Sequence, residues 1–288
     1  LLILSGDQLY RMNLRELIEE HAANKADITI AMLPVGRTEA MACGIMQMDA
    51  EHRINRFVEK PKEAALLDSL KMTPELNQQF GLEAGREAYL ASMGIYVFNR
   101  GLIQSLLDNP LSDFGKHIIP HAINTHRVFP YVYQGYWEDI GTIRNFFEAN
   151  LELTSELPRF NFFDMSAPIF SRPRFLPGSK INGAQIDHAV IADGCIINHA
   201  RIISSIVGLR TIVENGTELN RVVTLGSDYY ESQESVERHE KAGLPRLGIG
   251  ANCRIENAII DKNARIGNNV TISPAGKPEN VDHEKYFI

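Results

Sequence analysis

The sequence is poor in cysteine, in basic runs and in long apolar stretches. Only three cysteines occur among 288 residues, and their spacing suits neither a disulfide framework nor a zinc site. The formal net charge is −7 and no run of Lys and Arg exceeds two residues, so nothing favours binding to nucleic acid or to an anionic membrane surface. No apolar stretch approaches the roughly 20 residues of a membrane-spanning helix. These absences favour a protein of a reducing compartment that acts on a small polar metabolite.

Common phosphate-binding motifs are also missing. Neither G-x-x-x-x-G-K-[ST] nor G-x-G-x-x-G occurs. Residues 112–115, SDFG, match the magnesium-binding motif of protein kinases, but no HRD-type loop and no strand lysine of the VAIK type accompany them. A kinase is therefore rejected.

The first half of the chain alternates predicted strands with predicted helices. Apolar stretches at residues 27–35, 92–99 and 127–134 predict strands, and residues 44–49 and 53–61 predict a hairpin around a polar turn. Helices are predicted from Asn13, at residues 101–109 and from Thr142. This alternation is typical of a mostly parallel sheet with helices on both faces, where ligands bind beyond the carboxyl ends of the strands.

The chain begins directly on LLILSGD, whose first four residues predict a strand that is covered on both faces. Such a strand needs neighbours on either side, and some of them would come from preceding sequence. We therefore expect the sequence to be a fragment, in which Asp7 at the carboxyl end of this strand belongs to one wall of a larger site.

From about residue 155 the pattern changes. Residues 155–178 are rich in Pro, Phe and Arg and predict a linker pinned by its aromatic side chains. Beyond it, aliphatic residues fall six apart in the runs 191–209, 213–225 and 249–272, the last with a slip of one residue at Ile260, and this period favours a parallel β-helix with Gly and Asn at its corners. They are Ile191, Ile197, Ile203, Leu209, Val213, Leu219, Leu225, Ile249, Ile255, Ile260, Ile266 and Ile272. The polar residues 227–246 are expected to form an excursion from one coil.

Many proteins with this repeat are acyltransferases that use a histidine in or beside the coils, and His188 and His199 keep that alternative open. We expect both histidines to be solvent-facing residues on coil edges. The expected domains are a catalytic domain at 1–154, the linker at 155–178 and the β-helix at 179–288.

Two acidic positions suggest chemistry. Asp7 follows a predicted strand, where a turn aspartate that caps the next helix is the plain alternative. Glu138 and Asp139 follow the aromatic residues Tyr136 and Trp137 at a strand-to-helix junction, which suggests a sugar platform beside a metal ligand. Carboxylates from two strand ends could hold one Mg²⁺ and leave positions for phosphate oxygens.

Eight motifs in order resemble glucose-1-phosphate adenylyltransferase, also called ADP-glucose pyrophosphorylase, and most closely its cyanobacterial and plant branch. The motifs are SGDQLYRMN, FVEKP, ASMGIYVF, SDFG, GYWEDIGT, SAPIFSRPRFLPGSK, GSDYYE and IIDKNARIG. The resemblance implies a nucleotidyltransferase-type, Rossmann-like mixed α/β sheet domain, with its N-terminal part missing, followed by a left-handed parallel β-helix of hexapeptide repeats. It also implies a chain trimmed at both ends without the Gly-rich nucleotide loop, so the isolated fragment is expected to be inactive.

The resemblance implies the reaction and its residues. ATP and glucose 1-phosphate would give ADP-glucose and pyrophosphate for glycogen or starch synthesis. Asp7 and Asp139 match the aspartates that hold the catalytic Mg²⁺, and Lys60 matches the lysine on the sugar phosphate. The other matching substrate positions are Gly44, Glu59, Ser92, Tyr96, Asp113, Phe114 and Trp137.

The resemblance further places Arg172, Arg174 and Lys262 around an allosteric site for an anionic effector, a phosphorylated metabolite or phosphate. A solvated basic patch is the plain alternative. Ala251 stands where plant-type members often carry lysine, which leaves the choice of effector open.

Three other functions stay open at this point. The same machinery could serve another nucleotide or sugar phosphate, the chain could be a catalytically silent regulatory subunit, or it could be a hexapeptide acyltransferase. We expect a homo-oligomer, a tetramer by resemblance, in the bacterial cytoplasm or a plastid, with no nucleic-acid or membrane partner.

Overall fold

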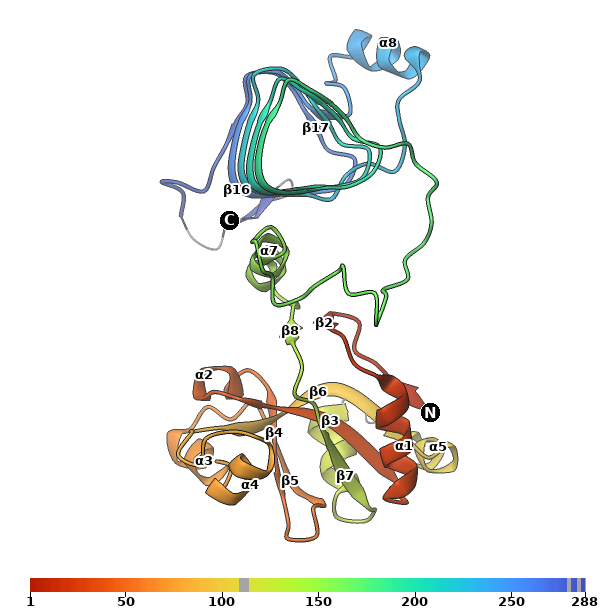
Figure 1. The fold of residues 1–288 in the computed structure, drawn as a ribbon, viewed down its shortest axis with the longest axis vertical. Helices are drawn as coiled ribbons and strands as arrows, with labels where there is room; N and C mark the ends of the chain where they lie inside the picture. Colours follow the sequence, from red (N-terminus) through yellow and green to blue (C-terminus); the bar gives the residue numbers. More distant parts are fainter. Residues whose placement is uncertain (109–113, 279–280, 284–285, 288) are drawn as a thin grey trace. The chain divides into compact units, whose positions relative to one another are not determined.

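The structure is a computed structural model that describes residues 1–108, 114–278, 281–283 and 286–287. The chain divides into two compact units, Leu1–Trp137 and Glu138–Ile288 (Figure 1). The boundaries expected from the sequence, after residues 154 and 178, stay predictions. Across the described ranges, none of the helices has the length and apolar character that crossing a bilayer requires.

The first unit is a sheet with helices packed on both faces. Its elements are β1 (Leu2–Ile3), β2 (Gln8–Tyr10), α1 (Leu14–Ala23), β3 (Ile28–Val35), α2 (Arg37–Ala40), β4 (Gly44–Met48), β5 (Ile54–Glu59), α3 (Ala64–Ser69), α4 (Pro74–Gln79), β6 (Tyr89–Phe98), α5 (Arg100–Leu107), the π-helix η1 (Phe114–Ile118), α6 (Ile119–Ala122) and β7 (Val128–Val132). The short strand β8 (Trp137–Asp139) crosses the boundary between the units.

The sheet is mixed, in the strand order β5-β4-β6-β3-β7, with β1 also paired to β6. The expected mostly parallel sheet is wrong, because β6 runs antiparallel to β1, β3 and β4, and only β3 and β7 pair in parallel among the described strands of this sheet. The predicted hairpin of β4 and β5 is confirmed. The tight hairpin reverses the chain between β4 and β5, and β6 keeps the direction of β5, because both run antiparallel to β4.

The expectation of a first strand covered on both faces is also wrong. Leu2 and Ile3 are only half-buried, and their neighbours Leu1 and Leu4 are 60% and 44% exposed. The reason is that β1 pairs along one side, with β6, and pairs with no other described strand.

Alternate residues of β6 supply two separate cores, as the two-residue period of a strand requires. Leu90 and Phe98 pack in a core with residues of α5 and α6 on one face. Met93 and Ile95 pack with Leu17 of α1 on the opposite face. Helix α1 begins after Asn13, whose side chain accepts a hydrogen bond from the Arg15 backbone N–H, so the predicted cap is confirmed.

The second unit is built on a parallel β-helix whose coils form the triangular section in Figure 1. One sheet has the order β10-β12-β14-β16-β18 and another the order β17-β15-β13-β11-β9. Its elements are α7 (Ile143–Glu152), β9 (Lys180–Asn182), β10 (Gln185–Ile191), β11 (Ile196–Asn198), β12 (Arg201–Val207), β13 (Ile212–Val213), β14 (Glu218–Thr224), α8 (Gln233–Lys241), β15 (Gly248–Ile249), β16 (Arg254–Ile260), β17 (Arg265–Ile266), β18 (Thr271–Ile272), β19 (Asp282–His283) and β20 (Tyr286–Phe287).

The hexapeptide pattern predicts the β-helix correctly but misplaces part of its core. Ile202, rather than Ile203, pairs in register with Leu219 and is fully buried. Leu209 and Leu225 also lie outside the core cluster. Three strict hexapeptides would need about 18 residues per coil, whereas Gln185 pairs with Arg201 and Arg201 with Glu218, coils of 16 and 17 residues. A shorter coil shifts the inward position by one residue.

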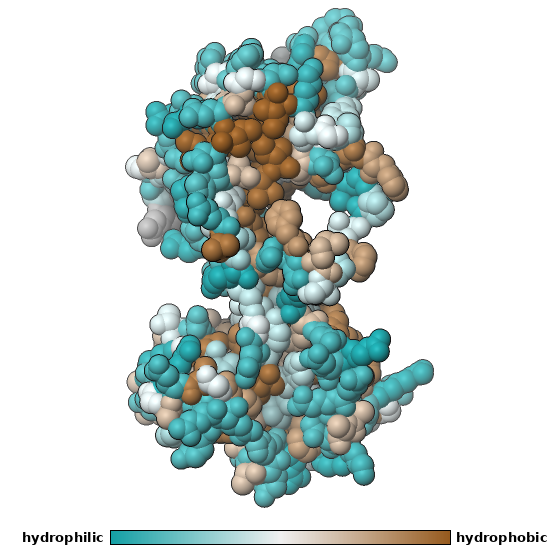
Figure 2. Space-filling model, in the orientation of Figure 1, coloured by the Kyte–Doolittle hydropathy of each residue, from teal (hydrophilic) through white to brown (hydrophobic). Residues whose placement is uncertain are grey.

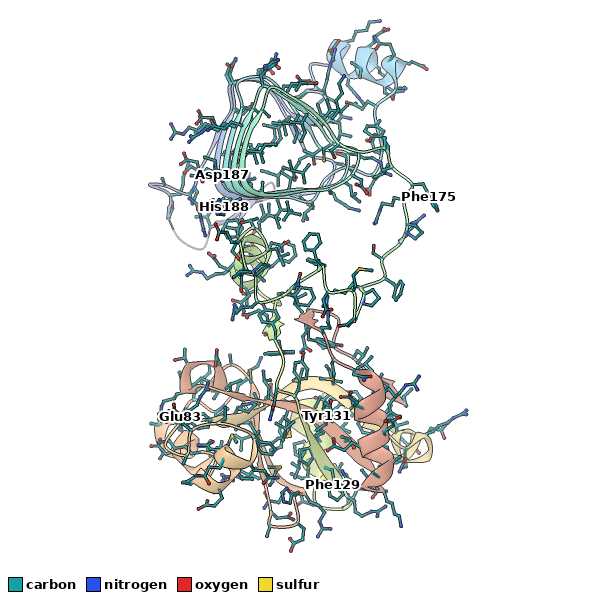
Figure 3. All side chains as sticks on the ribbon, viewed as in Figure 1. Glu83, Phe129, Tyr131, Phe175, Asp187 and His188 are labelled. Carbon is teal, nitrogen blue, oxygen red and sulfur yellow. The ribbon has the colours of Figure 1, made fainter. Side chains whose placement is uncertain are left out.

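The corners of the coils are left-handed turns, as the Gly and Asn pattern predicted. The φ angles are 55° at Asn252, 48° at Asn257 and 60° at Asn269. His188 and His199 occupy further left-handed corners with φ of 47° and 41°. Both histidines are exposed, which confirms their placement on coil edges, and His188 lies 2.9 Å from the carboxylate of Asp187 on the outside of the coils (Figure 3).

The polar excursion is confirmed, because Glu218 pairs with Arg254 although the residues between them include α8, a helix with no buried residue.

The prediction of a linker pinned by its aromatic side chains is wrong for most of these side chains. Phe160 is buried at 5% exposure, but Phe163, Phe170 and Phe175 are 88–93% exposed, and Phe175 extends away from the coils (Figure 3). Figure 2 shows that hydrophobic residues also cover the triangular end of the β-helix. The number of aromatic residues in a segment does not decide their burial, because burial depends on which other segments of the chain pack against them.

Candidate functional site

The first wall of the candidate site is an irregular stretch of β6. Ile30 of β3 pairs with Tyr96, but Met32 pairs with Ser92, so β6 carries two extra residues between these pairs. Gly94 lies in this bulge with φ of 68°, a conformation that side chains disfavour, and its N–H donates to the Ser92 hydroxyl over 3.2 Å. Bulges of this kind re-aim neighbouring side chains and often lie beside active sites.

The Ser5–Gly6–Asp7 turn lies against this bulge. A Cβ added to Gly94 would lie 3.4 Å from Cβ of Ser5 and 3.3 Å from the amide nitrogen of Gln8. Asp7 itself is exposed, and its Oδ1 accepts a hydrogen bond of 2.7 Å from the Ser5 hydroxyl. Since Asn13 caps α1, Asp7 is not the helix cap that the plain alternative supposed. Among the described residues, none donates a hydrogen bond to its second carboxylate oxygen.

Glu59 is the last residue of β5, and Lys60 follows it. Glu59 pairs in register with Gly44 of β4, and the Lys60 N–H donates to the Cys43 carbonyl over 3.0 Å. Lys60 adopts φ of 47°, which turns the chain sharply, and its side chain is exposed. The exposed ammonium is therefore available to a solvent-borne anion beside the half-buried carboxylate of Glu59.

An aromatic cluster continues this wall. The rings of Tyr96 and Phe114 stack with centroids 5.7 Å apart, and both contact Phe98 at 6.0 Å. Offset ring pairs of this kind stabilise the arrangement beyond the area they bury. The structure thus brings Tyr96 together with Phe114, and the neighbouring residue Gly115 lies against the Glu59 carboxylate. Ser92 lies at the β6 bulge, and the predicted residue Asp113 lies outside the described residues.

Two buried polar atoms near this wall lack a hydrogen-bond partner within the described part of the chain. They are the side-chain Oε1 of Gln8 and Nε1 of Trp137. Trp137 packs with Tyr10 and Tyr133 against the core under α1. Unpaired buried groups are costly and are found where a ligand or water completes the bonding, so these two atoms are candidate ligand contacts.

Asp139 is described within the second unit. Its Oδ1 accepts a hydrogen bond of 3.0 Å from the Gly141 N–H, and its backbone carbonyl accepts one of 2.9 Å from the Asn145 side chain. Thr142 caps α7 by accepting from the Asn145 N–H at 3.1 Å, which confirms the predicted start of this helix. The loop from Asp139 to α7 is therefore held by its own hydrogen bonds and leaves one oxygen of the Asp139 carboxylate uncommitted.

Asp7 and Asp139, each described in its own unit, offer carboxylate oxygens, the ligand type that Mg²⁺ prefers. Among the described residues no group of three or more His, Cys, Asp or Glu side chains comes close enough to hold an ion. Mg²⁺ does not need such a group, since it is bound through one or two carboxylates together with waters and substrate phosphates. Asp7 and Asp139 each commit one oxygen to a hydrogen bond, and each could offer the other to a hard cation.

The predicted effector residues have different surroundings. Arg172 and Arg174 are exposed, and Arg174 donates to the Arg172 carbonyl over 3.3 Å. Lys262 lies 2.7 Å from Asp228, with both side chains about half exposed. A hydrogen bond from Lys262 lowers the pKa of the Asp228 carboxyl. An ion pair this exposed is weak and could be opened by a competing anion.

A charged cleft in the second unit escaped the sequence analysis apart from Glu138. It has a volume of about 400 Å³ and is lined by Glu138, Asn145, Glu148, Ala149, Leu151, Glu152, Arg159 and Arg221. Arg159 makes two hydrogen bonds of 2.6 Å to Glu152 and thereby lowers the pKa of that carboxyl, while Arg221 contacts Glu148 at 3.2 Å. Because these carboxylates are already paired with arginines, the cleft has no clear ligand chemistry of its own.

Comparison with protein families gives two matches that follow each other along the chain. The nucleotidyl transferase family matches residues 1–156, and the GLGC left-handed parallel beta-helix domain matches residues 174–288. The first match covers more than half of the chain. Together they assign the mixed sheet and the parallel coils to known domain types and confirm the fold class predicted from the sequence.

Curated relatives agree with these matches. The chain is 41% identical over 293 residues to the "Glucose-1-phosphate adenylyltransferase large subunit 1, chloroplastic/amyloplastic" of Zea mays. It is 44% identical over 298 residues to the "Glucose-1-phosphate adenylyltransferase small subunit, chloroplastic/amyloplastic" of Triticum aestivum. Both alignments cover all of this chain but only 57% and 62% of those two proteins. Large and small subunits match about equally well, so similarity does not separate the two subunit types.

Proposed function

Because the chain belongs to the nucleotidyl transferase family and is a homologue of glucose-1-phosphate adenylyltransferase subunits, we propose that this protein makes ADP-glucose and pyrophosphate from ATP and glucose 1-phosphate. The observation that carries the proposal is the exposed ammonium of Lys60 next in sequence to the half-buried carboxylate of Glu59, which lies against η1, the helix that begins with Phe114. A cation can pair with the phosphate group, and a carboxylate near aromatic rings can accept hydrogen bonds from the sugar hydroxyl groups.

The chemistry is an in-line displacement. A phosphate oxygen of glucose 1-phosphate attacks the α-phosphorus of ATP, a new phosphorus–oxygen bond forms, and the bond to the β-phosphate oxygen breaks to release pyrophosphate. Such transfers depend on alignment and charge neutralisation rather than on a covalent enzyme intermediate. Lys60 would bind and orient the attacking phosphate, and Glu59 would accept hydrogen bonds from sugar hydroxyl groups.

We assign Asp7 and Asp139 as the residues that would hold Mg²⁺. The bound cation supplies charge neutralisation at the phosphate oxygens. The Ser5 hydroxyl and the Gly141 N–H each fix one oxygen of these two carboxylates, so each side chain is oriented before any ion binds. Ser92, Gly44 and Trp137 are proposed to line the sugar pocket, and Asp113 is proposed with them from the family resemblance alone.

The proposal extends to regulation, assembly and location. Arg172, Arg174 and Lys262 are proposed to bind an anionic effector, a phosphorylated metabolite or phosphate, with opening of the pair between Lys262 and Asp228. A homotetramer is proposed, in a bacterial cytoplasm or a plastid. Light scattering of the intact protein that gives a monomer would overturn the assembly.

Kinetics of a Lys60 variant test the substrate assignment. Lys60→Gln removes the charge and shortens the side chain by one atom, so one charge-assisted hydrogen bond to the phosphate is lost. Such bonds contribute about 1.5–3 kcal/mol, and we expect the KM for glucose 1-phosphate to rise roughly 10- to 100-fold while the KM for ATP stays unchanged. The measurement is pyrophosphate release with each substrate varied in turn.

Lys62→Gln is the matched control, because this exposed lysine follows on the same loop without a part in the site. Its KM values should equal those of the unmodified protein. An unchanged KM for glucose 1-phosphate in Lys60→Gln would remove Lys60 from the phosphate site. An intact protein that binds an anionic effector but releases no pyrophosphate would favour a catalytically silent regulatory subunit.

A further inference from the structure

The Glu59 carboxylate lies against a glycine on the neighbouring strand. In the register of the hairpin, Glu59 of β5 is directly opposite Gly44 of β4. A Cβ added to Gly44 would lie 2.9 Å from Oε2 of Glu59 and 2.5 Å from Cζ of Phe57. Real Cβ atoms essentially never show contacts that short, so a side chain at position 44 would force the ends of the Glu59 and Phe57 side chains to move.

A second glycine, distant in the sequence, approaches the same oxygen. Gly115 lies in the π-helix η1, which contacts β5. A Cβ added to Gly115 would lie 2.9 Å from Oε2 of Glu59 and 3.5 Å from Cζ of Phe57. The carboxylate oxygen is therefore bordered by two α-carbons, one from β4 and one from η1, with the Phe57 ring beside it. We refer to Gly44, Gly115 and Phe57 as the glycine slot.

The two glycines are required by space and not by backbone conformation. Neither Gly44 nor Gly115 is among the glycines with positive φ, so an alanine could adopt either backbone geometry. What an alanine would meet is the side chain of Glu59. Substitution at Gly115 therefore tests the contact itself, without the added strain of a left-handed residue.

The slot matters because no hydrogen bond from the described residues holds the Glu59 carboxylate. The pose of this half-buried group depends on the surfaces around it. Phe57 is itself packed against the core beside Phe114. We infer that Gly115 is a positioning residue for substrate recognition: the glycine slot aims the Glu59 carboxylate at the sugar hydroxyl groups of the sugar phosphate. This inference rests on the proposed function, which assigns Glu59 to the sugar.

The test is Gly115→Ala in the intact protein, with Gly101→Ala as the matched control. Gly101 lies in the first turn of α5, and an added Cβ there would meet nothing within 4 Å. A displacement of about 1 Å at a binding group can cost roughly 10²-fold in kcat/KM. We expect a loss of that order in Gly115→Ala, carried mainly by the KM for glucose 1-phosphate, since the sugar is remote from the reacting phosphorus. Gly101→Ala should be unchanged.

A double-mutant cycle separates positioning from a structural role. In a Glu59→Gln background, where the carboxylate is already lost, Gly115→Ala should raise the KM for glucose 1-phosphate by less than about 3-fold more. An equal effect in both backgrounds would overturn the inference. So would wild-type KM values in Gly115→Ala alone. An unmodified protein that releases no pyrophosphate would instead overturn the proposed function, which keeps the two failures distinct.

Misfolding of Gly115→Ala would not block the test. Adding Glu59→Asp to Gly115→Ala withdraws the carboxylate by one methylene and relieves the contact with the new Cβ. Recovery of thermal stability in the double variant would support a contact that passes through Glu59. Failure of this pair to recover would place the requirement for Gly115 elsewhere and contradict the inference.

Discussion

Asp7→Asn lowers the rate of pyrophosphate release by about 10²- to 10³-fold, the range expected when one group that stabilises the transition-state charge is removed. The substitution keeps an oxygen that can accept from the Ser5 hydroxyl, whose present hydrogen bond is 2.7 Å long. It removes only the negative charge that would hold Mg²⁺. Because Asp7 is exposed and caps no helix, the folded state should be unaffected.

The matched control for Asp7→Asn is Ser5→Ala. This variant removes the hydrogen-bond donor and leaves the carboxylate charge in place, so we expect a rate within a few-fold of the unmodified protein. Thermal unfolding of both variants checks that the fold is retained. A folded Asp7→Asn protein with full activity would show that the carboxylate at position 7 holds no catalytic ion.

Glu231→Gln destabilises the second unit by about 3 kcal/mol, the lower end of the range for breaking a buried ion pair. The Glu231 side chain is only 5% exposed and anchors the excursion around α8. Its carboxylate accepts from Arg265, from the Leu247 N–H and from His239, each over 2.7 Å. Loss of the charge leaves the Arg265 guanidinium without its acidic partner.

The same residue makes the excursion sensitive to acid. Burial acts to raise the pKa of Glu231, but the hydrogen bonds from Arg265, Leu247 and His239 outweigh it and lower the pKa to about 2 from the ordinary value of 4.5. A lowered folded-state pKa contributes stability that is complete above pH 4.5 and is lost as the pH falls from 4.5 towards 2.

Thermal unfolding and limited proteolysis between residues 227 and 247 measure the effect of Glu231→Gln. Glu234→Gln is the control, because Glu234 is exposed in the first turn of α8 and should contribute less than about 1 kcal/mol. Glu231→Gln should unfold earlier at pH 7 and should lose the acid dependence between pH 4.5 and 2. Equal stability of the two variants would contradict an anchoring role.

Local sequence signals predicted local structure well. Asn13 and Thr142 were found as helix caps because a cap depends on only a few neighbouring residues. The hairpin of β4 and β5 and the excursion around α8 followed from turn residues and from charge. The β-helix followed from a repeat that extends from Ile191 to Ile272.

Features set by packing between distant segments could not be predicted. The direction of β6 depends on which strand it joins, and the choice of Ile202 over Ile203 depends on the length of the stacked coil. The exposure of Phe163, Phe170 and Phe175 shows that aromatic residues in a linker need not be covered.

The candidate site likewise combines residues that local motifs predicted with residues that only contacts between distant segments reveal. Motifs pointed to Glu59 and Lys60, which lie at the end of β5 as expected, and to Asp7, whose expected place at the end of the first strand is wrong, because β1 ends at Ile3 and Asp7 directly precedes β2. No motif indicated that Gly115 borders the Glu59 carboxylate, because that contact joins η1 to β5. Once the hairpin was known, the register of β4 with β5 would have suggested that Gly44 lies opposite Glu59.

The most direct test of the account measures pyrophosphate release by the intact protein with glucose 1-phosphate and Mg²⁺, comparing ATP, UTP, GTP, CTP and dTTP. We expect release with ATP that depends on glucose 1-phosphate, and at most weak release with the other nucleotides. Preference for another nucleotide would contradict an ADP-glucose product, and absence of release with all five from a folded protein would contradict catalysis at Asp7 and Lys60.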